Sequence, residues 1–423
     1  MNTPPDIQPA SIFRQPNQLW DDPAHHPTSL GCRKCPEYAR CGGIHTGANV
    51  FDCSDLCHCT DKSKCDLVCR SRPTHFVQRV REVGGLDLHN VARTTPVVSP
   101  ILPEVVSFID HKYSRIEMFQ SSVVALPLYR VIDLAKAKVH VHSRDELADR
   151  FHVSGDATIV LSGVDKDRFI ERWWELPNRE KILRDLHLLG VGLFTTPNYS
   201  VLTDVPRTDN LYAIKRIALT WAEASNAGLP TALHINARTE RDYANWIDFI
   251  AKRQEVTTLA FEFATGCGQP ERIDWHLNQL GHLATQIKRP LAIVVRGGTR
   301  RLNVLRQHFS RVTLLETESF SKTLRRQRAY ISASGKLKWA KSPTPEGIPV
   351  DELLAHNAAI VRRFYEAHID PAPKLRIPRL IARRAAYRDN QSIQPSLLGN
   401  LHVPGQARPV PTDRHGMISA AKT

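Results

Sequence analysis

The chain has 423 residues, a formal net charge of +14 and 42% hydrophobic residues. This length and apolar content are ample for a sizeable folded core. They exclude the class of proteins that lack a hydrophobic core. No stretch offers the roughly 18 unbroken apolar residues that a membrane span needs, so we expect no membrane partner.

The N-terminus, Met1 to Pro9, has neither a basic start nor an apolar core, so it is not a secretory signal. We therefore predict a cytoplasmic protein. Reductants in that compartment disfavour structural disulfides, and a cluster of cysteines there more often binds metal.

Eight of the nine cysteines crowd into residues 32–69. They are Cys32, Cys35, Cys41, Cys53, Cys57, Cys59, Cys65 and Cys69. Eight thiolates saturate two 4Fe–4S clusters, each held by four cysteines, or two tetrahedral zinc ions. The irregular spacing, with a single C-x2-C knuckle, favours two 4Fe–4S clusters as cofactors and leaves two Zn ions as the alternative. Residues 1–80 are poor in apolar periodicity, so we expect their folding to depend on this metal.

Cys53, Cys57 and Cys59 are spaced C-x3-C-x-C, one residue short of the C-x3-C-x2-C motif of radical S-adenosylmethionine enzymes. In those enzymes the motif directly follows the first barrel strand, whereas here a long segment separates Cys59 from the first strong strand pattern at Val105. Radical chemistry is therefore kept only as a minor alternative.

Residues 85–345 alternate short β-rich runs with longer amphipathic ones, a pattern typical of β/α units around a parallel sheet. Strands are predicted at 105–109, 123–126, 138–142, 158–161, 192–196, 231–235, 259–263, 291–295 and 312–315, and helices at 209–226, 239–253, 271–288 and 299–309. This α/β pattern predicts a (β/α)8-like barrel, imperfect at its start, with a doubly wound sheet as the alternative. No dinucleotide-binding or P-loop glycine motif is present.

In such a barrel, chemistry takes place where the strands end at their carboxyl side. Polar residues are dense there: Asp110, His111, Ser162, Asp165, Asn198, Tyr199, Ser200, Asp204, His234, Asn236, Glu262, Arg296 and Glu316. His234 and Glu262 stand on otherwise apolar strands, so their side chains should point into the barrel. Burial there is costly unless the group is paired or used, and the structural alternative is a polar layer that anchors loops.

Roles follow from the chemistry of these side chains. Glu262 is a candidate general base or nucleophile, His234 a proton relay, and Asp204 a third catalytic residue. Arg296 can bind a phosphate or carboxylate with its forked donors. The other candidates for substrate binding are Asn198, Tyr199 and Asn236.

Two further signals are weaker. Gly297 and Gly298 lead into a predicted helix, where free backbone amides favour an anion, although a tight loop is the simpler interpretation. Cys267, between two glycines, has no visible activating partner, which favours a loop thiol over a nucleophile.

Basic residues concentrate in two segments. Between Arg296 and Lys341 there are twelve Lys or Arg and two acidic residues, and between Pro371 and Thr423 there are nine and two. The first segment includes aromatic residues that can stack on bases, so we predict contact with nucleic acid or a phosphate-bearing substrate. The candidates are Arg325, Arg326, Arg328, Lys336 and Lys338, and the alternative is a solvated helix face. Residues 346–423 are predicted to form a helical extension and a basic, disordered tail.

Short motifs in the central region carry a resemblance. They are Leu193-Phe194-Thr195-Thr196-Pro197-Asn198-Tyr199-Ser200 with Asp204, Pro206 and Asn210, the strand ending at Asn236, and Val294-Val295-Arg296-Gly297-Gly298. Within residues 100–310 they resemble an uncharacterised family of barrel-like proteins from phages and mobile elements. The resemblance implies a barrel fold and a mobile-element setting, but no activity, and it does not include the cysteine-rich segment.

Two functions of different classes are consistent with these patterns. One is a metal-dependent barrel enzyme, iron–sulfur favoured, acting on nucleic acid or a nucleotide-like anion. The other is a non-catalytic nucleic-acid-binding protein with a structural zinc site. The enzyme is the better explanation if one pocket contains the side chains of Asp204, His234, Glu262 and Arg296.

Overall fold

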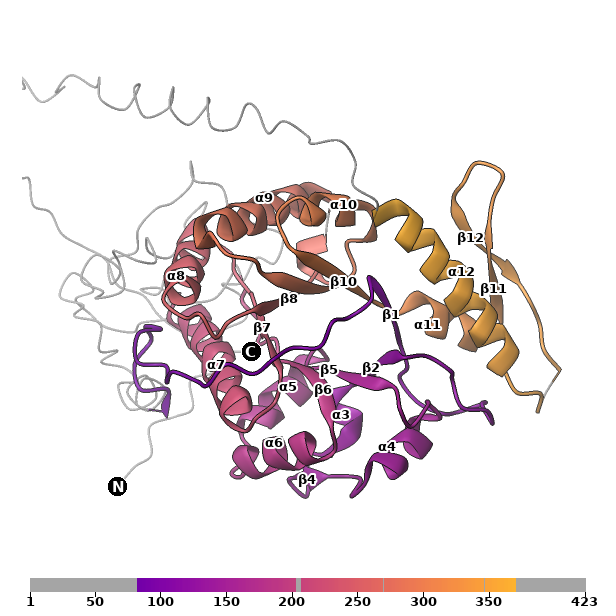
Figure 1. Cartoon of the computed structure of the whole chain (residues 1–423), viewed down its shortest axis with the longest axis horizontal. Helices are drawn as coiled ribbons and strands as arrows, with labels where there is room; N and C mark the ends of the chain where they lie inside the picture. The colour runs from indigo at the N-terminus through magenta and orange to yellow at the C-terminus, as the bar shows by residue number, and fades with distance from the viewer. Residues whose placement is uncertain (1–81, 203–206, 269, 346, 370–423) are drawn as a thin grey trace, which may run out of the picture. The chain divides into compact units, whose positions relative to one another are not determined.

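The computed structural model describes residues 82–202, 207–268, 270–345 and 347–369. Within them, eight parallel strands close into a barrel in the order β1-β10-β9-β8-β7-β6-β5-β2 (Figure 1). The strands are β1 (Val105–Phe108), β2 (Val123–Pro127), β5 (Thr158–Ser162), β6 (Val191–Thr195), β7 (Thr231–His234), β8 (Thr258–Glu262), β9 (Ala292–Arg296) and β10 (Arg311–Glu316). The predicted (β/α)8-like barrel is confirmed, while the cysteine-rich segment lies outside the described residues.

Helices connect most of these strands. They are α3 (Leu128–Val131), α4 (Arg144–Phe151), α5 (Asp167–Trp174), α6 (Arg179–Leu188), α7 (Arg207–Asn226), α8 (Glu240–Ala251), α9 (Pro270–Ile287), α10 (Leu302–Arg306) and α11 (Glu318–Leu324), with short 3-10 helices η4 (Gly266–Gly268) and η5 (Thr299–Arg301). A capping box in which Thr239 and Asp242 bond each other's backbone starts α8. None of the described helices is both long and apolar enough to cross a membrane.

One predicted strand, 138–142, is wrong as a barrel strand. Only Lys138–Val139 is extended (β4), and it pairs antiparallel with β3 (Ile132–Asp133) outside the barrel. Val139 and Val141 are buried, whereas Lys138 and His140 are exposed. A run with one exposed face suits a small surface sheet, because the parallel strands of a barrel are covered on both faces.

The barrel is irregular where it begins, as the sequence predicts. Residues 109–122 connect β1 to β2 without a helix. The outer face of β1 is instead covered by α12 (Asp351–Ile369), which packs against β1, α10 and α11. Leu354, Ala358, Val361 and Tyr365 are buried at helical spacing and form the face of α12 that makes this contact.

A cluster of apolar side chains, small and large, fills the interior of the barrel. Ala232, Ala260 and Val294 belong to this interior cluster, which is separate from the larger core between the strands and the helices. Because alternate residues of a strand point to the same side, the residues two positions further along also face the interior. These are His234, Glu262 and Arg296. Glu262 and Arg296 lie above the apolar layer, whereas His234 is level with Ala260, within it.

Beyond α11 the chain forms an antiparallel hairpin of β11 (Gln327–Ile331) and β12 (Leu337–Lys341). It forms a two-stranded sheet of its own, separate from the barrel strands, beside α12 (Figure 1).

Candidate functional site

A pocket of about 820 Å³ lies over the carboxyl ends of the barrel strands. Seven of the eight strands, or the loops that follow them, supply its lining. Its charged residues are Asp110, Asp165, Lys166, Asp167, Arg238, Glu262 and Arg296. Both signs of charge are present, so the pocket suits a ligand with several kinds of polar group.

Glu262 and Arg296 meet at the centre of this lining. They end the neighbouring strands β8 and β9 and are paired in register. Nε of Arg296 lies 2.9 Å from Oε2 of Glu262, whose side chain is 2% exposed against 21% for Arg296. Oε1 of Glu262 accepts a hydrogen bond of 2.6 Å from the backbone N–H of Ala264. The carboxylate is therefore held in one orientation.

Burial raises the pKa of Glu262 above its ordinary value, while Arg296 and the Ala264 amide limit the rise. A carboxyl group balanced in this way can gain or lose a proton nearer neutral pH than an exposed one. This is the electrostatic condition for a general acid or base.

Arg296 also extends toward the opposite strands. One terminal nitrogen lies 3.5 Å from the carbonyl oxygen of Val164, in the loop after β5, and the guanidinium carbon lies 5.9 Å from the ring centroid of Phe108 on β1. A guanidinium has five N–H donors, so these contacts leave donors for a ligand in the pocket.

His234 lies deeper than Glu262, at the level of Ala260 in the register between β7 and β8. It is 2% exposed and does not belong to the described pocket lining. Neither ring nitrogen makes a hydrogen bond of good geometry among the described residues, although the backbone of Thr196 lies close enough to favour the charged ring slightly. Burial, with a smaller effect of Arg296, lowers the pKa of His234 to about 3. The ring is therefore neutral near pH 7.

Asn198 and Asn236 lie together in the pocket wall. Nδ2 of Asn236 donates to Oδ1 of Asn198 at 3.0 Å and to the carbonyl oxygen of Tyr199 at 2.9 Å. The pair fixes the loop after β6 against the end of β7. Both side chains line the pocket, as the prediction of substrate contact requires.

Tyr199 lies elsewhere. Its ring is fully buried, packs edge-on against Trp174 and lies under the guanidinium of Arg216, whose carbon is 4.2 Å from the ring centroid. The residue does not belong to the described pocket lining. These contacts give it a role in packing between the barrel and its helices.

Arg238 is a pocket residue that the sequence did not single out. Its Nε donates to the carbonyl oxygen of Val201 at 2.6 Å, and a terminal nitrogen lies 3.5 Å from Sγ of Cys267. Burial raises the pKa of the Cys267 thiol, although Arg238 opposes the shift. Cys267 is therefore a thiol rather than a thiolate near pH 7. The sequence signal that could have identified Arg238 as a site residue is its position, two residues beyond Asn236 at the end of a strand.

Gly297 and Gly298 are explained by packing. Both have positive φ, +76° and +66°, and a Cβ at Gly297 would lie 2.5 Å from the backbone nitrogen of Ala264. A Cβ at Gly298 would lie 2.9 Å from the ring of Phe263. The loop after β8 lies so close to positions 297 and 298 that both require glycine. This supports the tight-loop interpretation over an anion site.

The predicted nucleic-acid contacts fall on or beside the hairpin. Arg328 and Lys338 are exposed on β11 and β12, Lys336 is exposed just before β12, and Arg325 and Arg326 follow α11. The eight cysteines of residues 32–69, Asp204 and the tail from 371 onward lie outside the described residues. Among the described residues, no group of three or more His, Cys, Asp or Glu could hold a metal ion.

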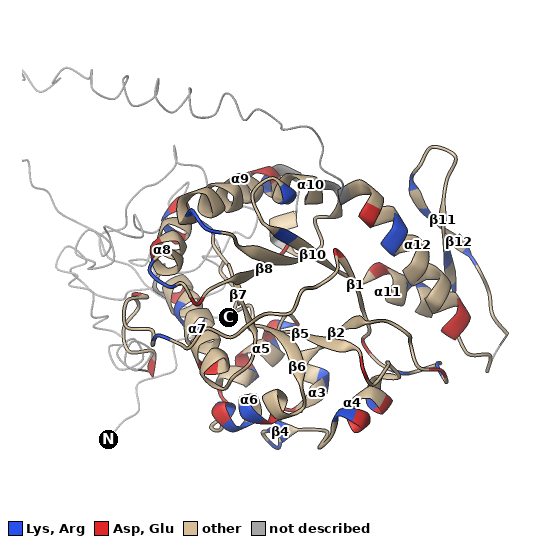
Figure 2. Ribbon diagram, viewed as in Figure 1, with Lys and Arg blue, Asp and Glu red and all other residues tan. Residues whose placement is uncertain are grey.

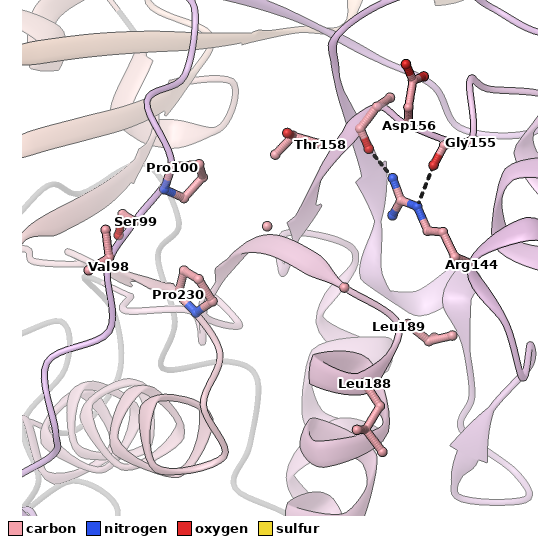
Figure 3. A pocket seen from close by; sticks show the side chains of 13 residues that line it. Val98, Ser99, Pro100, Arg144, Gly155, Asp156, Thr158, Leu188, Leu189 and Pro230 are labelled. Atoms are coloured by element: carbon pink, nitrogen blue, oxygen red, sulfur yellow. Dashed lines mark hydrogen bonds between the residues drawn. The ribbon is translucent and has the colours of Figure 1, made fainter.

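A second hollow, of about 610 Å³, lies at the amino ends of β5 and β6 (Figure 3). Its arginine, Arg144, bonds the backbone carbonyls of Gly155 and Ala157 and so serves the loop beside it. Leu188, Leu189, Pro100 and Pro230 supply an apolar wall (Figure 3). Active sites of barrels of this type form at the opposite end, so we assign no chemistry to this hollow.

Comparison with known proteins gives no family for this chain. No protein-family model matches it, and no curated protein matches its sequence. The resemblance to a phage and mobile-element family stays a prediction, and functional inference depends on the site itself.

Proposed function

We propose that the protein is an enzyme that acts on nucleic acid or a nucleotide-like anionic substrate at the carboxyl ends of the barrel strands. The buried pair of Glu262 and Arg296 supports this best. A buried ion pair contributes little to stability, because desolvation offsets the attraction. A perturbed carboxyl group in a pocket is, by contrast, a common feature of active sites.

Each polar residue has a role in this proposal. Glu262 removes a proton from the substrate, and Arg296 binds a phosphate or carboxylate group beside it. His234, neutral near pH 7, is the proposed relay that takes this proton from Glu262 and releases it to solvent, which restores the neutral ring. Asn198 and Asn236 orient the substrate with their amide groups.

The metal centre belongs to the same proposal. The eight cysteines supply eight thiolates, a donor set that suits two 4Fe–4S clusters and also two zinc ions. We favour iron–sulfur, which would give the enzyme an electron carrier. Iron, sulfide and zinc analysis of protein purified without air separates the two, with about eight irons per chain for two 4Fe–4S clusters.

The test of catalysis uses the full chain, purified without air and mixed with short DNA, RNA and nucleoside monophosphates. Mass spectrometry of the mixtures reports conversion. We expect Glu262→Gln to lower the rate by a factor on the order of 100 or more, because a general base is lost. Glu175→Gln, at an exposed pair with Arg172 on α5, is the matched control and should retain the wild-type rate.

Absence of conversion in every mixture, or an unchanged rate in Glu262→Gln, would contradict the enzyme proposal. The basic hairpin favours a second candidate in that case, a non-catalytic nucleic-acid-binding protein with a structural zinc site.

A further inference from the structure

The hairpin has two distinct faces. Ala329 pairs with Trp339 and Tyr330 with Lys338, and directly paired residues of antiparallel strands share a face. Ala329 is 1% exposed, and its backbone N–H donates to Oδ1 of Asn357 on α12 at 2.7 Å. The face of Ala329 and Trp339 therefore turns toward the body of the protein. Tyr330 and Lys338 belong to the opposite face.

This outer face is basic and carries an aromatic ring. Lys336 lies two residues from Lys338 and so shares its face, whereas Arg328, although two residues from Tyr330, reaches α12, where a terminal nitrogen lies 3.1 Å from Nδ1 of His356. Tyr330 is 45% exposed, and the three basic residues are also exposed. Residues 325–341 contain six Lys or Arg and no Asp or Glu. In Figure 2, blue segments of the ribbon mark basic residues on this hairpin.

The hairpin is held in shape at its tip and at its base. The backbone N–H of Ser332 donates to the carbonyl oxygen of Lys336 at 2.9 Å, and Oγ of Ser332 accepts from the N–H of Lys336 at 3.1 Å. The tip between them, residues 333–335, has only small side chains. At the base, Nζ of Lys322 lies 5.7 Å from the ring centroid of Trp339. A partner would therefore bind a preformed shape, with little ordering cost.

We propose that the β11–β12 hairpin binds duplex DNA by entering its major groove. A two-stranded antiparallel ribbon fits the B-form major groove, which is about 12 Å wide, and the basic face would meet its phosphates. The major groove of A-form RNA is deep and narrow and does not admit such a ribbon. This inference rests on the proposed function, which includes a nucleic-acid partner. It specifies that partner as duplex DNA and the binding element as the β11–β12 hairpin.

The test measures binding of a short labelled DNA duplex to the full-length protein by fluorescence anisotropy at several salt concentrations. The double charge reversal Lys336→Glu with Lys338→Glu should weaken binding roughly tenfold or more and reduce the salt slope by about 2. Lys136→Glu with Lys138→Glu is the matched control, because these lysines have the same spacing on the β3–β4 sheet and are also exposed. This control should bind as the wild type does.

Two results would overturn the inference. One is equal affinity of the two double variants for duplex DNA. The other is that duplex RNA or single-stranded DNA binds the protein as tightly as duplex DNA does. The anisotropy assay measures binding without any turnover, so a failure of catalysis at the barrel mouth remains distinguishable from a failure of DNA binding at the hairpin.

Discussion

At the barrel mouth, the charge of Arg296 influences the protonation of two other side chains. The positive charge of Arg296 holds down the pKa of both Glu262 and His234, although burial pushes these two pKa values in opposite directions. Burial disfavours the charged form of each group, so the acid becomes weaker and the imidazole less basic. Burial therefore favours the uncharged form of both groups, and Arg296 opposes this effect at Glu262 and adds to it at His234.

His234 permits a prediction that separates function from stability. We expect His234→Leu to raise the free energy of unfolding by about 1 to 2 kcal/mol, because a buried imidazole without a hydrogen bond of good geometry is replaced by an apolar group. Catalysis should be lost in the same variant. Urea unfolding together with the conversion assay measures both effects.

The control for this prediction is His276→Leu. Nδ1 of His276 lies 3.0 Å from the hydroxyl of Tyr243, so its loss leaves that buried hydroxyl unpaired and should destabilise the protein. A loss of stability in His234→Leu, like the loss expected for His276→Leu, would contradict the prediction and make His234 a structural core residue.

Glu316, at the end of β10, predicts a pH dependence of stability. Oε1 accepts from the backbone N–H of Ser319 at 2.8 Å, and Oε2 accepts from its hydroxyl. Burial nevertheless raises the pKa of Glu316 to about 7. The folded state thus holds the proton more tightly than the unfolded chain, in which the pKa of a glutamate is near its ordinary value of 4.5. This contribution is full below pH 4.5 and is lost as the pH rises through 7.

The change should amount to roughly 3 kcal/mol, because one pKa unit corresponds to about 1.4 kcal/mol. Urea unfolding of the wild type and of Glu316→Gln between pH 4.5 and 8 measures this change. The difference between the two free energies of unfolding at each pH cancels the opposing effect of the buried histidines, which both proteins share. Parallel pH curves for the two proteins would show that Glu316 titrates in its ordinary range.

At the scale of elements, one side chain of α12 fastens the hairpin. Asn357 is fully buried, and its Oδ1 accepts from the N–H of Ala329. Its Nδ2 donates at 2.8 Å to Oγ1 of Thr323 and to the carbonyl oxygen of Gln327. A single amide therefore ties α11, β11 and α12 together.

We expect Asn357→Ala to lower the free energy of unfolding by roughly 2 to 4 kcal/mol, because buried polar groups of the hairpin lose their partner. The exposed position Glu366→Ala, on the same helix, should have an effect within about 0.5 kcal/mol. Urea unfolding compares the two. Equal stabilities would mean that the hairpin does not depend on Asn357.

At the scale of the whole molecule, the barrel has a core of its own. The buried apolar cluster between strands and helices runs from Val83 to Tyr365 and includes the fully buried Trp173, Trp221 and Trp246. The predicted metal ligands, by contrast, all precede residue 82. The folding of the barrel should therefore not depend on the metal.

This independence predicts the outcome of metal removal. After oxidation with ferricyanide and treatment with EDTA, the unfolding temperature followed through the buried tryptophans should change by no more than about 4 °C, equivalent to roughly 1 kcal/mol. Activity should be lost at the same time. A fall of more than about 10 °C would show that the metal centre supports the barrel core.

The barrel strands were predictable because the chain repeats one pattern. Each of the runs that became β5 to β10 is short and largely apolar, and has polar residues at or just beyond its end. Prediction failed at 138–142, where alternation with exposed charges marks a surface sheet, and it missed the hairpin, whose basic residues also suit a helix face. Local propensity does not decide between these outcomes, because long-range pairing selects one of them.

For the site, the sequence by itself determined that His234, Glu262 and Arg296 follow apolar positions on neighbouring strands and so point into a barrel. It could not show that Glu262 and Arg296 pair, that Tyr199 turns away from the pocket, or that Arg238 joins it. These outcomes depend on the register between strands and on the course of the loops. Contacts between residues far apart in the chain set both, and only the tertiary structure contains those contacts.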